Sequence, residues 1–439
     1  MKESDTLDNF RPPPQEDATF RLVTRLLLGL AALGLLVFAS TIVHTAGCHP
    51  ILDTIPVLAQ WLDSSSGLTE TLWLPINEHH LVWMRLLAVA DAVLVGGWPL
   101  LSGGVSVLCL ACLVWVPGRV LLRAGLPAGT AWAAICVLVL LVFAAPAAED
   151  SMLAINGVYP QAAGIGMLAL GAAAAGRWGL AFGLAMLAPL GNGVALVMFP
   201  ILPWLGLRAG PQGRALRLAL LLALGGGAFC LLYLWGGSAQ QHNWPEGTVA
   251  LRYAAAMLGL PISRSGSFGW LGVLSGGLLG LVGLAALIRK PNDELGRLAQ
   301  GGILFGFGAA ALGAFGRSDV AGGLPAVRYT ALVLPLQIGV FCLALQASFA
   351  PQRARWRRGA SFGLLLIGTG LLLLSVLTAR ASVASLAVYR TAIVRFAAGD
   401  RDPALAPYIY PDLAEATRVW NELARRGRPT CRPGSIPIP

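Results

Sequence analysis

Eleven apolar segments, separated by short polar stretches, constrain this chain more than any other feature. The longer ones reach the roughly 20 residues that a helix needs to cross a bilayer. The apolar runs are continuous and do not alternate with polar residues, which argues against membrane-spanning strands. The sequence therefore predicts an all-α, polytopic membrane protein. We expect helices near residues 22–46, 101–121, 128–146, 160–176, 178–190, 193–207, 216–235, 267–288, 297–315, 330–349 and 360–378.

The composition agrees with this fold class. Of the 439 residues, 56% are hydrophobic and 12% are charged, whereas a soluble domain carries roughly 25% charged residues. The net charge of +10 does not predict a nucleic-acid partner, because its meaning depends on the side of the membrane that each arginine occupies. Residues 1–21 read as a disordered cytoplasmic tail. The apolar run after them is too long for a signal-peptide core and lacks an A-x-A cleavage site, so it predicts an uncleaved first span.

The arginines predict the orientation of the chain, because cytoplasmic loops are enriched in Lys and Arg. With a cytoplasmic N-terminus, the positive clusters at 119–123, 208–217, 289–297 and 353–358 all lie inside. Residues 379–439 then form an external tail, with helices expected over 382–397 and 412–426. The expected location is the inner membrane of a bacterium, with the tail in the periplasm.

Two places in this topology leave alternatives. Segment 81–97 is apolar but only about 25 Å long as a helix, and it contains Arg85 and Asp91. We expect it to lie along the outer surface, so that helix 101–121 ends with its arginines in the cytoplasm. The short segments 178–190 and 193–207 flank Gly191-Asn192-Gly193. They form either a hairpin or one kinked helix.

The first outer loop, residues 47–100, holds the densest group of ionisable side chains. Asp53 follows the first span closely, where a carboxylate can accept a proton from a sugar hydroxyl or an amine. The alternative role for Asp53 is the N-cap of the next helix. Glu78, His79 and His80 start the surface helix, where polar side chains are costly unless they meet a ligand. They would hold an acceptor or a phosphate, or cap the helix. A metal ion on Glu78 and His79 is a further alternative, although the spacing is not that of HExxH.

Other predicted outer loops add arginines, a histidine and two cysteines. Arg317 and Arg328 bracket the loop at 316–329, where a guanidinium can bind a lipid phosphate. The alternatives are snorkelling or an ion pair with Asp319. His242 lies in the loop at 236–265. The two cysteines expected on the oxidising side are Cys48 and Cys431, and a disulfide between them is a testable guess.

This layout resembles the GT-C superfamily of integral-membrane glycosyltransferases, which use polyprenyl-phosphate sugars at the outer membrane face. The similarity is carried by the topology, by Asp53 after the first span, by the N-E-H-H-x4-R pattern from Asn77 to Arg85, and by Arg328-Tyr329 before a late span. His80 stands where arginine is expected. Asp53 is followed by Thr54 and not by a second acid. The resemblance implies that Asp53 is the general base and that Arg328 binds the donor phosphate.

The resemblance therefore implies a transferase that moves a sugar from a polyprenyl-phosphate donor to a periplasmic glycan, lipid or protein. No organic cofactor or resident metal is expected. The second interpretation is a polymerase or ligase that uses lipid-linked oligosaccharides. The third is a transporter or flippase, which would place polar residues near the bilayer midplane in repeated halves. Only Asn192 fits that pattern.

Overall fold

The computed structural model describes most of the chain. The described residues are 18–45, 51–52, 54–63, 68–74, 80–144, 156–208, 212–234, 246–260, 269–291, 293–317, 325–349 and 357–426. Within these ranges all regular structure is helical, and no strand occurs. The protein is an all-α polytopic membrane protein, as predicted.

The first half of the chain begins with a long helix, continues with three short helices in the predicted first loop, and then enters the bundle. The elements of this half are α1 (Ala18–Thr45), α2 (Thr54–Asp63), α3 (Leu68–Trp73), α4 (Val82–Leu94), α5 (Leu100–Arg123), α6 (Ala128–Val142), α8 (Val158–Ala174), α9 (Trp178–Leu187), the 3-10 turns η1 (Ala188–Leu190) and η2 (Gly193–Val197), and α10 (Met198–Arg208).

The second half completes the bundle and ends outside it. Its elements are α11 (Gln212–Leu234), α12 (Gly247–Leu258), α13 (Gly269–Ile288), α14 (Glu294–Arg317), η5 (Val327–Tyr329), α15 (Thr330–Ser348), α16 (Arg357–Ala397), η7 (Pro403–Leu405) and α17 (Leu413–Arg425). Among the described residues, seven helices are long and apolar enough to cross a membrane: α1, α5, α11, α13, α14, α15 and α16. Four shorter apolar helices occupy the other four predicted segments.

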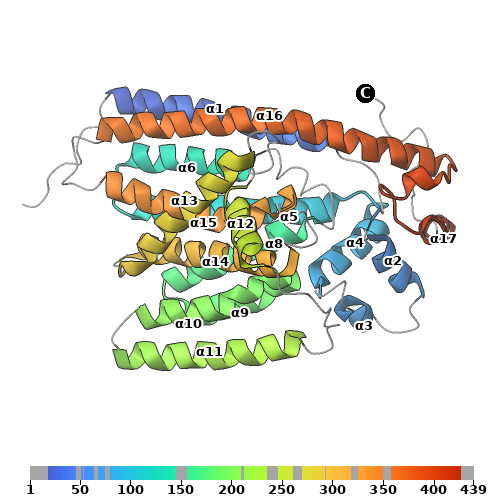
Figure 1. Ribbon diagram of the computed structural model, residues 1–439, viewed down its shortest axis with the longest axis horizontal. Helices are drawn as coiled ribbons and strands as arrows, with labels where there is room; N and C mark the ends of the chain where they lie inside the picture. The colour runs from blue at the N-terminus through green and yellow to red at the C-terminus, as the bar shows by residue number, and fades with distance from the viewer. Residues whose placement is uncertain are drawn as a thin grey trace, which may run out of the picture.

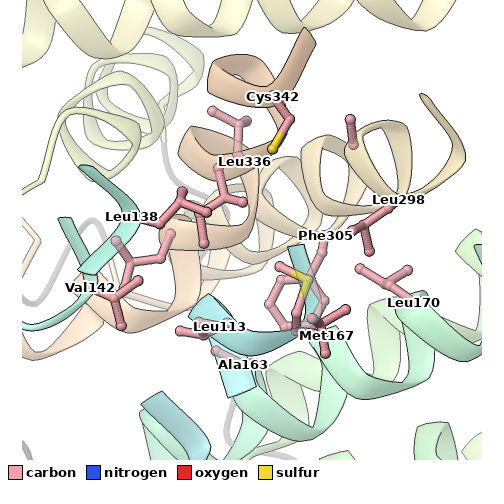
Figure 2. Packing of buried hydrophobic residues seen from close by; sticks show 14 of the residues in the cluster. Leu113, Leu138, Val142, Ala163, Met167, Leu170, Leu298, Phe305, Leu336 and Cys342 are labelled. Atoms are coloured by element: carbon pink, nitrogen blue, oxygen red, sulfur yellow. The ribbon is translucent and has the colours of Figure 1, made fainter. Parts of the chain in front are cut away.

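The centre of the bundle is formed by α5, α6, α8, α14 and α15, whose side chains make one apolar core (Figures 1 and 2). Phe305 of α14 is fully buried and reaches α8, where a Cβ on Gly166 would come within 3.0 Å of its ring. A Cβ on Gly302 would collide with the carbonyl oxygen of Pro335, so α14 and α15 pack backbone to backbone. Small residues permit this close approach in lipid.

The segments on either side of Gly191 form a hairpin, which decides between the two predicted alternatives. Arg177, just before α9, donates its backbone N–H to Ala172 at the end of α8. Arg208, at the end of α10, donates to the carbonyl of Leu287 at the end of α13. Both ends of the hairpin therefore lie at the same side of the bundle, and the connection around Gly191-Asn192 reaches the opposite side. We call this connection, residues 188–197 with η1 and η2, the α9–α10 turn.

Helix α12 was not predicted, because the segment 236–265 reads as a loop. The helix packs between α13, α14 and α15 and crosses them steeply (Figure 1). Its C-terminal carbonyls at Leu258 and Leu260 accept hydrogen bonds from the side-chain amide of Gln337 at 3.1 and 3.0 Å. These bonds satisfy groups that a helix end otherwise leaves unpaired inside the protein.

Helix α16 does not stop at the predicted end of its span near residue 378. The helix continues to Ala397, so that its whole length from Arg357 is 41 residues, about 60 Å at 1.5 Å per residue. Its C-terminal part projects beyond the bundle (Figure 1). Its last turns pack with α17, α2 and α4 around Phe396 and Trp420, whose rings meet edge to face at 5.0 Å. We call this group (α2, α3, α4, residues 389–397 of α16, and α17) the end module.

The end module joins the predicted first loop to the predicted tail. Arg418 of α17 donates two hydrogen bonds to the Asp63 carboxylate of α2, at 2.6 and 2.8 Å. The hydrogen bond from Arg418 lowers the pKa of the exposed Asp63 carboxyl. The Leu52 N–H donates to the Ile409 carbonyl at 2.5 Å. Residues from opposite ends of the sequence therefore hold one small apolar core together.

Candidate functional site

Several of the predicted site residues lie outside the described residues. These are Asp53, Glu78, His79, His242, Cys48 and Cys431, so their predicted roles and the predicted disulfide stay predictions. The chain neighbours of Asp53 are described. Leu52 has a φ of +52°, which is uncommon for a non-glycine residue and costs backbone strain. Thr54 begins α2, so this strained position lies directly before the predicted base and the helix.

Arg85 lies on the face of α4 that packs against the bundle. Leu81, Met84 and Ala88 share this face by helical spacing, and they cluster with Val57 of α2 and Val158 of α8. Arg85 itself is 0% exposed. The sequence therefore places a guanidinium between the first-loop helices and the start of α8, and α4 is too short to be among the candidate membrane spans.

The Arg85 guanidinium has only part of its hydrogen-bonding capacity used. Nη1 donates to Oε1 of Gln60 at 2.7 Å, whereas Nε and Nη2 are buried without a hydrogen-bond partner among the described residues. Burial lowers the pKa of Arg85 to about 10. An uncompensated buried cation is unfavourable, and its free N–H groups match the two oxygens of a phosphate or carboxylate.

Asp91, the nearest acid along α4, serves a different purpose. Its two carboxylate oxygens accept from the backbone N–H groups of Leu101 and Ser102 at 2.8 and 3.2 Å. It therefore caps the start of α5 from outside that helix. Burial raises the pKa of Asp91, and the bonds from α5 oppose that rise. The carboxylate is thus committed to the α5 N-terminus.

Arg328 and Tyr329 lie at the start of α15, on the same side of the bundle. The Tyr329 ring meets the Tyr159 ring of α8 edge to face at 5.2 Å, and Tyr159 also packs against the cluster formed by the Arg85 face of α4. Arg328 is exposed, with its guanidinium carbon 5.7 Å from the centre of the Tyr329 ring. Two segments that the sequence singled out separately thus converge on Tyr159.

Arg317 is the last residue of α14 and so lies at this side of the bundle as well. Because α14 and α15 are consecutive and antiparallel neighbours, their loop ends meet here. The N-termini of α8 and α15 also point to this side, and helix N-termini carry partial positive charge. Arginines and helix ends together make this side attractive to an anion.

His80 is buried in an aromatic cluster with Trp73 and Tyr233. Its ring stacks on Trp73 at 4.7 Å and meets Tyr233 of α11 edge to face at 5.2 Å. Nδ1 lies 2.6 Å from the Trp73 carbonyl oxygen, and the backbone N–H donates to the Tyr233 hydroxyl at 3.2 Å. That hydroxyl donates to Pro189 in the α9–α10 turn at 3.1 Å. His80, the described member of the predicted polar patch, is thus anchored to the bundle.

Sequence reasoning did not find Tyr233 or Gln161. Tyr233 is 153 residues from His80, and an aromatic residue in an apolar helix gives no signal of a hydrogen bond. Gln161 of α8 is 1% exposed, and neither atom of its side-chain amide has a hydrogen-bond partner among the described residues. A glutamine within a predicted span was the one available signal, because polar residues in spans are functional candidates.

Among the described residues, no group of three His, Cys, Asp or Glu side chains is placed to hold a metal ion. The fold and this site define a multi-pass α-helical membrane protein with a basic, polar site at the side occupied by the end module. Comparisons with protein-family models, curated proteins and solved structures found no match to the chain.

Proposed function

We propose that this protein is a GT-C-like glycosyltransferase that moves a sugar from a polyprenyl-phosphate donor to a glycan, lipid or protein acceptor. The observation that carries the proposal is the fully buried Arg85 guanidinium, of which two nitrogens, Nε and Nη2, have no hydrogen-bond partner in the part of the chain that the structure describes. Such a group is stabilised when an anion with matching oxygens binds beside it. A donor whose sugar is joined through phosphate supplies that anion.

The reaction assigns roles to residues near this site. Asp53 takes the proton of the acceptor hydroxyl, whose oxygen attacks C1 of the sugar. The bond from C1 to the phosphate oxygen breaks, and polyprenyl phosphate leaves with its negative charge stabilised by Arg85 and Arg328. The strained backbone at Leu52, directly before Asp53, supports a functional role for this segment.

The arrangement of basic residues supports an external site. The side of the bundle opposite the end module carries Arg119 and Arg123 at the end of α5, and Arg208 and Arg297 against the ends of α13 and α8. By the positive-inside rule that side is cytoplasmic. The end module and the site then face the periplasm of a bacterial inner membrane, and the N-terminus is cytoplasmic.

A transporter is less well supported. Asn192, the polar residue that favoured it, accepts a hydrogen bond from the backbone of Val194 at 3.0 Å and so caps η2. Its side-chain oxygen is therefore used within the α9–α10 turn. This local use removes the main reason to place a transport site at that position.

Transfer by membrane vesicles that contain the protein and its native acceptors tests the proposal. Vesicles are incubated with a panel of undecaprenyl-phosphate sugars labelled in the sugar, and label in lipid, glycan and protein fractions is counted. We expect transfer with at least one donor. Asp53→Asn should lower the rate at least 100-fold, as loss of a general base does, and Arg85→Met should lower it about 100-fold or more.

Arg123→Met is the matched control, because Arg123 is an exposed arginine at the other side of the bundle. It should transfer label at the rate of the unaltered protein. The proposal is wrong if no donor supports transfer, or if Asp53→Asn and Arg85→Met both retain the full rate in vesicles that contain equal amounts of folded protein.

A further inference from the structure

Two buried side chains beside the α9–α10 turn have hydrogen-bonding atoms for which the described part of the chain supplies no partner. The first is His80, which is 2% exposed. Its Nδ1 must carry the proton of the neutral ring, because the Trp73 carbonyl oxygen at 2.6 Å can only accept. Nε2 is then a hydrogen-bond acceptor, and it is buried without a partner among the described residues. A group that meets Nε2 must donate a hydrogen.

The second side chain is Gln161 of α8, which borders the same turn. A Cβ on Gly191 would come within 3.3 Å of the Gln161 Cβ, so α8 and the turn are in direct contact here. The amide offers two N–H donors and one carbonyl acceptor, and neither its nitrogen nor its oxygen has a partner within the described ranges of the chain. Gln161 therefore needs a group that can both donate and accept.

His80 reaches this turn from the other direction, through Tyr233. The Tyr233 hydroxyl receives the His80 N–H and donates to the Pro189 carbonyl, two residues before Gly191. Trp83, three residues after His80, donates its indole N–H to the Leu187 carbonyl at 3.0 Å. The start of α4 and the start of α8 are therefore held against one short turn, with His80 and Gln161 on its two flanks.

The unpaired atoms select a chemical class of ligand. A phosphate or carboxylate accepts only, so it would leave Nε2 of His80 and the oxygen of Gln161 unpaired. An ammonium donates only, so it would leave the Gln161 N–H groups unpaired. A hydroxyl both donates and accepts, and buried polar groups that stay unpaired cost binding energy. These two residues thus complement a neutral group with several hydroxyls.

We infer that His80 and Gln161 bind the hydroxyl groups of an uncharged sugar on the donor, while Arg85 binds the donor phosphate. This inference rests on the proposed function and adds the substrate class to it. The sugar is predicted to carry neither a carboxylate, which cannot donate to Nε2 of His80 or to the Gln161 oxygen, nor an ammonium, which cannot accept from the Gln161 N–H groups.

Binding to the full-length protein in nanodiscs tests the inference. The probes are a short-chain prenyl phosphate without sugar and the same lipid esterified to glucose, galactose, mannose, N-acetylglucosamine, glucuronic acid or 4-aminoarabinose. Dissociation constants are measured for the unaltered protein, for His80→Asn and for Gln161→Met. Asparagine can still donate to the Trp73 carbonyl but lacks Nε2, and methionine keeps the volume of Gln161 without its amide.

We expect at least one neutral sugar to strengthen binding about tenfold or more over the sugar-free lipid. Each variant should reduce that advantage about five- to tenfold, because one neutral hydrogen bond is worth about a factor of ten in affinity. Gln300→Met is the matched control. Gln300 is buried on the other side of the bundle, and its amide nitrogen donates to Ala286 and Arg289. This variant should keep the full advantage.

The outcomes separate this inference from the proposed function. If the unaltered protein binds none of the probes, the proposed function fails. The inference is overturned if the protein binds the sugar-free lipid but no neutral sugar strengthens that binding, or if only a charged sugar does. In that case the proposed polyprenyl-phosphate donor is retained. The inference is also overturned if both variants bind the sugar-free lipid and retain the full sugar advantage, as expected when a buried water satisfies these atoms.

Discussion

Replacing Arg85 by methionine should make the protein more stable. A guanidinium ordinarily titrates above about 12, and burial holds the pKa of Arg85 at about 10. Since a tenfold change in a protonation equilibrium is worth about 1.4 kcal/mol, keeping this cation charged in the ligand-free protein costs about 3 kcal/mol. Methionine fills the space without that cost. The lost partner, Gln60, is exposed and can bond to water.

The expected gain is therefore about 1–3 kcal/mol, in the range found when buried charges are replaced by apolar residues of similar volume. Thermal unfolding in detergent should show a higher midpoint for Arg85→Met. Arg85→Lys should show no such gain, because it keeps a buried charge. At pH 7 Arg85 is charged in both the folded and the unfolded protein, so the penalty is fully present. It is relieved only above about pH 10, where the folded protein loses the proton first.

The control for this experiment is Arg123→Met, which removes an exposed arginine and should change the midpoint little. A fall in the midpoint of Arg85→Met by several degrees would refute the reasoning. It would mean that the guanidinium is fully paired in the native protein and supports the fold instead of awaiting an anion.

Three other substitutions, and one control substitution, probe the fold. Asp91→Ala removes the acceptor for two N–H groups of α5 and should cost about 1–2 kcal/mol in thermal unfolding; an unchanged midpoint would contradict the capping role. Trp420→Ala empties the centre of the end module and should cost about 3–5 kcal/mol, seen as faster proteolysis of α17 than of the bundle. Gly164→Ala places a Cβ 2.7 Å from the Cys109 Cα and should lower the midpoint, whereas Gly227→Ala meets nothing within 4 Å and should not.

The spans could be predicted because each is a continuous apolar run, and this signal needs no knowledge of tertiary contacts. Helix α12 could not be predicted in this way, because it is only 12 residues long and contains Arg252, which makes it too short and too polar to be recognised as a span.

The length of α16 was not predicted for another reason. Its polar residues after 378 suggested a boundary, but no Gly or Pro interrupts the chain before Gly399, which ends the helix with a φ of +96°.

The candidate site was predictable only as a list of residues. The first-loop pattern singled out His80 and Arg85, since ionisable groups are rare in such a chain. It could not show that the Asp91 carboxylate accepts from the backbone of α5. Nor could it show that Arg85 has no acidic partner among the described residues. Nor could it find Tyr233 and Gln161, because their proximity to His80 depends on how α8, α11 and the α9–α10 turn pack.

The end module can fold only after the last helices of the chain have been synthesised. Its core combines Ile55 and Leu58 with residues such as Phe396 and Trp420, more than 300 residues later in the chain. At roughly 5–20 residues per second of synthesis, the first-loop helices exist for about 20–70 s before their partners emerge. During that interval the tail does not yet exist to cover the apolar faces of the first-loop helices. A nascent chain that stalls after α15 would therefore leave the first loop exposed to proteases and chaperones, so maturation of this site awaits the last helix to be made.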